Sequence, residues 1–233
     1  MKNKGRKITL LVSSLFLISV TGFVIKNTTM INKRKSDRIE THRNYPYSEE
    51  LTDMISNSSY IVKGQFTGYD HSWNMARNPD NIQEEDKTNY VEGRLYNFKV
   101  EKIFKNEDDI SDEIKVNFMH SRTETLVEAD ERITLKDSLY KEPELEQEYV
   151  LFLLKDKDFH NYYAATEPFL VKIEKGSVSL QSNLLQDDNE NIQTFKLKDN
   201  SVLDVVEEIP HINDFLTGMS YREFERIMNE RNK

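Results

Sequence analysis

The sequence predicts an α+β protein that is mostly β: a hydrophobic N-terminal helix, then a small barrel-like antiparallel sheet with flanking helices. Three observations lead to this fold class. Short runs along the body alternate apolar and polar residues, the period of a strand with one buried face. Aromatic residues make up 10% of the chain, which suits sheets better than disorder. An uncharged apolar run of 18 residues lies near the N-terminus.

That apolar run, residues 8–25, follows a stretch with four basic side chains and no acid. Eighteen residues rise about 27 Å as a helix, close to the thickness of the hydrocarbon core of a bilayer. A basic stretch followed by an apolar one is also typical of a secretory signal. We therefore expect residues 1–25 to be a signal peptide or a membrane anchor.

Basic residues flank the run on both sides, so the distribution of positive charge does not decide its orientation. A leading signal normally sends the rest of the chain across the membrane. We expect residues 26–46, which are basic and polar, to form a stalk, and residues 47–233 to form a single extracytoplasmic β-rich domain with C-terminal helices. The expected location is the cell membrane, with a single pass, or outside the cell if the leader is cleaved.

The expected domain is strongly acidic. The whole chain has a net charge of -9, and residues 1–35 carry eight basic residues and no acid, so the remainder carries -17. Such a surface disfavours nucleic acid as a partner and disfavours lying flat on anionic lipid. The absence of cysteine excludes disulfides, thiol catalysis and cysteine-based metal sites.

The first elements of the domain are a helix and a strand. Leu51, Met54 and Ile55 recur at helical spacing and predict a short helix over residues 48–55. Ser48 is a suitable cap for that helix. Residues 60–69 then read as a strand, in which Gly64 marks a bulge or bend of the kind that lets a strand curl into a barrel.

Further strands follow where apolar residues alternate or run together. They are expected at residues 96–100, 114–118, 133–135, 149–154, 162–165, 169–173, 178–180 and 192–197. The turn at residues 174–177 predicts a hairpin with a type I turn and a bulge.

The remaining segments are expected to be loops and helices. Residues 74–89 and 121–145 are polar or irregular and predict loops. A helix is expected over Val202–Ile209, and the last helix starts at Ser220, where Glu223 completes a capping box.

Three segments carry a resemblance to a known family: Tyr60–Gln65 (YIVKGQ), Tyr96–Asn106 (YNFKVEKIFKN) and Glu148–Leu153 (EYVLFL). Together they resemble the OB-type barrel of the metalloproteinase-inhibitor and netrin-like superfamily, and especially exported or anchored Gram-positive bacterial proteins that share that plan. The resemblance covers about residues 50–180 and implies an OB-like barrel. The animal inhibitors act through an N-terminal cysteine and disulfides, which this chain lacks, so no inhibitory residue carries over.

Known catalytic and cofactor motifs are absent. No G-x-S-x-G elbow, P-loop or G-x-G-x-x-G occurs. The five histidines do not lie at metal-ligand spacing; they are His42, His71, His120, His160 and His211. The acidic run at residues 187–191 is expected to be a solvated loop, with calcium as the alternative. We name no catalytic residue, cofactor or metal ligand.

One cluster offers a ligand-contact surface. Tyr69, His71 and Trp73 alternate just past the first strand, and an extended chain would bring all three to one face. A tryptophan beside a tyrosine at a strand end can stack a sugar ring or grip a peptide, although packing under a neighbouring loop is the simpler interpretation.

These observations favour a membrane-anchored or secreted binding module at the cell envelope. Its expected partner is another protein, with membrane contact through residues 8–25. One alternative is an envelope hydrolase with an unrecognised carboxylate pair, which a deep pocket lined by facing carboxylates would favour. Another is a structural subunit of a membrane complex.

Overall fold

The computed structural model describes residues 37–42, 45–126, 129–186 and 190–231, so the hydrophobic run at residues 8–25 lies outside it. Strands dominate these ranges, and two helices accompany them, which confirms the predicted mostly β, α+β class. Within the same ranges, no helix has both the length and the apolar character needed to cross a bilayer.

The strands, in chain order, are β1 (Asp37–His42), β2 (Tyr60–Asn74), β3 (Arg77–Asn78), β4 (Asn81–Glu85), β5 (Val91–Lys105), β6 (Glu113–Leu126), β7 (Glu131–Lys136), β8 (Glu148–Asp156), β9 (Asn161–Ala164), β10 (Leu170–Glu174), β11 (Ser177–Gln181), β12 (Glu190–Lys196) and β13 (Val202–Glu208). The helices are α1 (Leu51–Asn57) and α2 (Tyr221–Arg231), with a short 3-10 turn, η1 (Asn183–Leu185).

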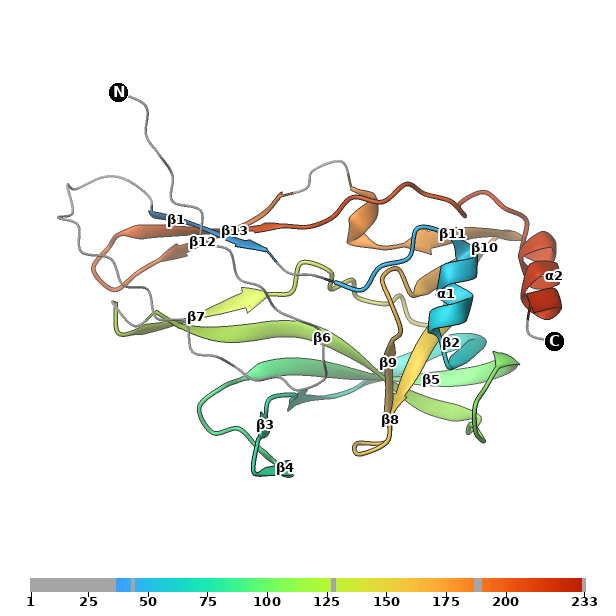
Figure 1. The fold of residues 1–233 in the computed structure, drawn as a ribbon, viewed down its shortest axis with the longest axis horizontal. Coiled ribbons are helices and arrows are strands. Elements are labelled where there is room, and N and C mark those ends of the chain that lie inside the picture. Colours follow the sequence, from blue (N-terminus) through green and yellow to red (C-terminus); the bar gives the residue numbers. More distant parts are fainter. Residues whose placement is uncertain (1–36, 43–44, 127–128, 187–189, 232–233) are drawn as a thin grey trace.

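The largest sheet has the strand order β11-β10-β8-β2-β5-β6-β7 (Figure 1). The short strand β9 pairs antiparallel with β8 and parallel with β6. Hydrogen-bonded pairing therefore passes from β2 to β5, β6, β9 and β8 and returns to β2. Apart from the β6–β9 contact, the pairs of this sheet are antiparallel.

The longest contact is between β2 and β5, and its register shifts at four places. One shift falls between Lys63 and Gly64, where the sequence predicted an irregularity. A Cβ added to Gly64 would lie 1.9 Å from the carbonyl oxygen of Lys99 on β5. Glycine is therefore needed here because two backbones approach closely.

The main core combines aromatic rings of this sheet with one face of each helix. Phe66 packs edge-on against Tyr96, Phe98, Phe118 and Tyr149, with ring centroids 4.9–6.1 Å apart. Such edge-to-face pairs stabilise beyond the area that they bury. The predicted face of the first helix is buried in this cluster, with Leu51, Met54 and Ile55 of α1, and Phe224 and Met228 of α2 join it.

A second, three-stranded sheet has the order β1-β13-β12 and lies over β7 (Figure 1). Ile133 and Leu135 of β7 form a buried cluster with Leu203 and Val205 of β13. Strand β1 runs parallel to β13. The segment predicted to be a stalk, residues 26–46, thus contributes a strand of the folded body.

The predicted helix over Val202–Ile209 is wrong, because Val202–Glu208 forms β13. The run has valine at 202, 205 and 206, and β-branched side chains favour strands. Of its two neighbours, β12 is the other arm of a hairpin, whereas β1 is distant in sequence. Their pairing outweighs the weak local signal.

Two hairpins refine the sequence predictions. The segment 74–89, expected to be a loop, contains the β3–β4 hairpin. The β10–β11 hairpin is confirmed, but its turn type was predicted wrongly. Glu174 pairs with Ser177, and both Lys175 and Gly176 have positive φ, 51° and 80°. This is the signature of a two-residue type I′ loop, whose twist matches that of the strands.

The helix starts also differ in detail. Helix α1 begins at Leu51 rather than Ser48, and the Ser48 hydroxyl lies 2.8 Å from that of Thr166 instead. Ser220 accepts a hydrogen bond from the backbone N–H of Glu223 at the start of α2. The Glu223 carboxylate pairs with Arg226 at 2.7 Å, so only the serine half of the predicted capping box forms.

Candidate functional site: an aromatic cavity beside Trp73

A cavity of about 640 Å³ lies beside the largest sheet. Its walls come from β2 and β6, from the β3–β4 hairpin, from the loop after β7 and from the turn between β8 and β9. Large apolar side chains form much of the lining, among them Trp73, Met75, Phe118, Phe159 and Phe169. This volume and character are typical of ligand-binding pockets.

An arginine and two aromatic rings meet at the cavity wall. The ring centroids of Trp73 and Phe159 are 5.1 Å apart. The guanidinium carbon of Arg77 lies 4.6 Å from the Trp73 ring and 4.5 Å from the Phe159 ring. Each contact is a favourable cation–π pair. The β2 strand, the β3–β4 hairpin and the β8–β9 turn each supply one of the three side chains.

Arg77 is a cation with unused hydrogen-bonding capacity. Its Nε is buried and has no acceptor among the described residues. Burial lowers the pKa of Arg77, and the charges of Glu85 and Asp156 oppose that change. The group stays charged, because an arginine side chain does not deprotonate in proteins.

The orientation of Trp73 is set by its neighbours. Its indole N–H donates to Oδ1 of Asn117 on β6 at 3.0 Å. Gly93 of β5 lies beneath this hydrogen bond, because an added Cβ would be 2.5 Å from both Trp73 Nε1 and Asn117 Oδ1. Neither Asn117 nor Gly93 stood out in the sequence, since their roles depend on contacts between strands.

Of the three residues predicted to share a surface, only Trp73 lines the cavity. The β2–β5 register shifts between Tyr69 and His71, so β2 holds an extra residue there and the simple alternation is interrupted. Tyr69 is half exposed and donates to Ser72 Oγ at 2.9 Å. His71 is exposed, and its Nδ1 lies 2.9 Å from Asp70.

Two acidic side chains, Asp137 and Glu167, also line the cavity. Burial raises the pKa of Glu167 to about 8, the charge of Asp137 adds to this, and a hydrogen bond from Ser182 opposes it. Glu167 is partly accessible because it borders the cavity, yet protein surrounds its carboxyl closely. It is therefore largely protonated at neutral pH. Asp137 is buried and accepts a hydrogen bond from the backbone N–H of Leu139 at 2.9 Å.

A separate polar network is centred on Glu92 of β5. Burial alone would raise the pKa of Glu92, but its hydrogen bonds to Ser72, Arg94, His120 and Ser121 lower it to about 2. These contacts are 2.9–3.1 Å long and join β2, β5 and β6. Because the carboxylate is already surrounded by four partners, we assign this network a structural role.

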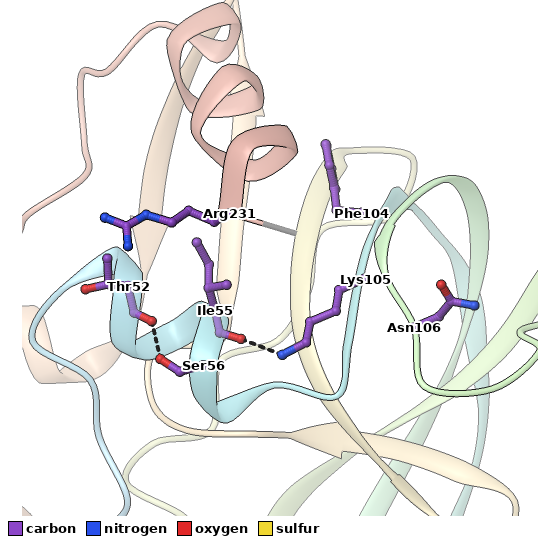
Figure 2. A pocket seen from close by; sticks show the side chains of 7 residues that line it. All are labelled: Thr52, Ile55, Ser56, Phe104, Lys105, Asn106 and Arg231. Atoms are coloured by element: carbon purple, nitrogen blue, oxygen red, sulfur yellow. Dashed lines mark hydrogen bonds between the residues drawn. The ribbon is translucent and has the colours of Figure 1, made fainter. Parts of the chain in front are cut away.

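A shallower notch of about 460 Å³ lies between α1, the end of β5 and the end of α2 (Figure 2). Two of its polar side chains form hydrogen bonds to the backbone of α1. Lys105 donates to the backbone oxygen of Ile55 at 2.9 Å, and Ser56 donates to that of Thr52. In the described ranges, no cluster of three or more histidine, aspartate or glutamate side chains is arranged to hold a metal ion.

The cavity beside Trp73 is thus the strongest candidate site by volume, lining and unused polar capacity. The acidic run considered for calcium, residues 187–191, lies mostly outside the described ranges. No protein-family model, curated protein or solved structure matches this chain.

Proposed function

We propose that the chain is a binding module of the cell envelope, exported by residues 1–25, whose cavity receives a segment of a partner protein. The observation that carries the proposal is the cavity of about 640 Å³ at which Trp73, Arg77 and Phe159 meet. Tryptophan, tyrosine and arginine are the residue types that most often dominate protein–protein binding energy. The Arg77 guanidinium supplies a charged anchor within an apolar surround.

We also propose that the strands around this cavity form an OB-type barrel. The ring of pairings through β2, β5, β6, β9 and β8 supports a closed five-stranded barrel. In such barrels, ligands bind between the loop that joins the first two strands and the loop that joins the last two. Arg77 lies in the β2–β5 connection and Phe159 in the β8–β9 connection, which suits this arrangement.

The net charge of residues 36–233 favours some classes of ligand over others. Many OB-type barrels bind oligonucleotides, but a net charge of -17 on residues 36–233 disfavours a polyanion. A protein segment is compatible with a mostly apolar cavity whose wall holds Arg77 between two aromatic rings.

Site-specific photo-crosslinking tests the binding function. A photo-reactive amino acid replaces Phe159 in the full chain, and cells of the producing bacterium are irradiated before the membranes are solubilised. We expect one discrete crosslinked protein, identified by mass spectrometry, which Trp73→Ala removes. The matched control carries the same group at Tyr69, outside the cavity, and should give none. Equal crosslinking from both positions, or none from either, would refute binding at the cavity.

A hydrolase is the second candidate, favoured by one observation: Asp137 and Glu167 share the cavity and Glu167 has a raised pKa. Two carboxyl groups in one cavity, one of them with a raised pKa, suit general acid–base catalysis. Turnover of cell-wall fragments or peptides by the purified chain, abolished by Glu167→Gln and by Asp137→Asn, would select this candidate over simple binding.

A further inference from the structure

We infer that the cavity binds a carboxylate of its ligand, and that Arg77 is the residue that binds it. The inference rests on the proposed binding function and names the chemistry of the bound segment. That segment is a stretch of peptide that presents a carboxylate, from a side chain or from a chain terminus, next to a large apolar side chain.

The side chain of Arg77 has little conformational freedom. Two aromatic rings lie 4.5 and 4.6 Å from its guanidinium carbon, so the planar group is held by contacts with its surroundings. Little side-chain freedom remains to be lost when a ligand binds. A guanidinium fixed in this way can offer two parallel N–H donors, the arrangement that fits a carboxylate.

Several of the other charged side chains of the cavity wall already have partners. Lys155 donates to both oxygens of Asp108, at 3.0 and 3.1 Å. Asp156 accepts from the backbone N–H groups of the turn that follows it. Glu167 is largely neutral at pH 7 and neither attracts nor repels an anion strongly. Two further lysines of the lining, Lys141 and Lys157, are exposed to solvent, whereas Arg77 is partly buried between two aromatic rings and its Nε has no acceptor among the described residues.

The acidic side chains of the cavity wall favour a carboxylate over a phosphate. Three further acids, Asp137, Asp156 and Asp158, line the same cavity. Their repulsion grows with the charge of the ligand, so a monoanion is favoured over a dianionic phosphate. The apolar wall around Arg77 requires that the carboxylate be attached to a group able to displace water from Met75, Phe118 and Phe169.

A peptide selection tests the inference. The full chain, solubilised in detergent, is used to select from a displayed library of random nonapeptides. Each enriched peptide is then synthesised with its carboxylate replaced by the matching amide: aspartate by asparagine, glutamate by glutamine, or a free C-terminus by a C-terminal amide. These acid–amide pairs also distinguish a side-chain carboxylate from a terminal one. Dissociation constants are measured by calorimetry for wild type, Arg77→Gln and the control Arg222→Gln, an exposed arginine on α2.

We expect the amide to weaken binding to the wild type and to Arg222→Gln by about tenfold or more, the usual effect of losing a charged hydrogen bond. In Arg77→Gln the acid and the amide should bind within about twofold of each other. Arg77→Lys, which keeps the charge without the planar fork, should recover only part of the preference.

Failure of this inference and failure of the proposed binding function give different results. If enriched peptides carry no carboxylate and bind wild type and Arg77→Gln equally, the inference is overturned while the binding function stands. If no peptide is enriched above detergent alone, the cavity does not bind peptide segments and both proposals fall. Should Arg77→Gln not fold, as judged by circular dichroism, the acid–amide comparison on the wild type and Arg77→Lys decides.

Discussion

Glu167 shows how one buried carboxyl links the cavity to the stability of the fold. Its pKa is raised to about 8 by burial and by the charge of Asp137. In the unfolded chain the carboxyl loses its proton near its ordinary value of 4.5. Between these two values the folded state binds more protons than the unfolded state, so this group makes stability fall as the pH rises.

Replacing Glu167 by glutamine should remove that part of the pH dependence. At pH 4 the variant and the wild type should have similar free energies of unfolding, because both side chains are neutral. At pH 8.5 the variant should be more stable by about 4 to 5 kcal/mol, the free-energy equivalent of the shift from 4.5 to about 8. Urea unfolding at both pH values measures this difference. A difference that is the same at pH 4 and at pH 8.5 would mean that Glu167 does not titrate as described.

At the residue scale, the sequence located one part of the site and missed the rest. Trp73 was selected because an aromatic cluster at a strand end is visible in the sequence. Arg77 lies four residues later, in a stretch that reads only as a polar loop. What distinguishes it is its contact with Phe159, 82 residues further along the chain. No local pattern could have paired the two.

At the scale of elements, strands with regular alternation were predictable, and their irregularities were predictable where glycine marked them. Strands β5, β6, β8 and β12 overlap the expected segments, because β5, β6 and β8 bury one or both faces and β12 half-buries alternate residues. Strand β13 did not, because its conformation depends on pairing with β1, more than 160 residues away. The bulge between Tyr69 and His71 was not predicted.

Two glycines of β2 form a matched pair for a test of this reasoning. An added Cβ at Gly64 would meet the Lys99 carbonyl oxygen at 1.9 Å, whereas one at Gly68 would meet nothing within 4 Å. Gly64→Ala should therefore lower the free energy of unfolding by about 3 kcal/mol or more, since backbone cannot move aside as a side chain can. Gly68→Ala should change it by less than about 0.5 kcal/mol. Urea denaturation of both variants gives the comparison, and similar losses would contradict the close approach of β2 and β5.

At the scale of the whole molecule, the fold joins two sheets that differ in construction. The larger sheet carries the cavity, and the three-stranded sheet begins with β1, the first described element after the N-terminal segment. A buried network connects them: Tyr45 and Ser138 both donate to Glu207 of β13, at 3.2 and 2.7 Å. Strand β1 pairs with β13, so the chain from residue 37 onward is part of the same folded body.

The proposed export has a direct test on the full chain. In a bacterial host, we expect the chain in the membrane fraction or in the medium, and we expect protease added to intact cells to degrade it. Leu15→Arg with Leu17→Arg should retain the chain inside, because each charge at the centre of a membrane helix costs about 3 kcal/mol. Ser13→Ala with Ser14→Ala is the matched control and should leave export intact. Finding the intact wild type in the soluble cell interior would overturn this part of the proposal.

The chain has a single tryptophan, and that tryptophan forms part of the cavity wall. All indole fluorescence of this protein therefore comes from one place, where a cation, a phenyl ring and an amide surround the fluorophore. Anything that enters the cavity changes the polarity and quenching around it. The molecule consequently carries its own optical reporter, and occupancy can be followed in real time without any attached dye.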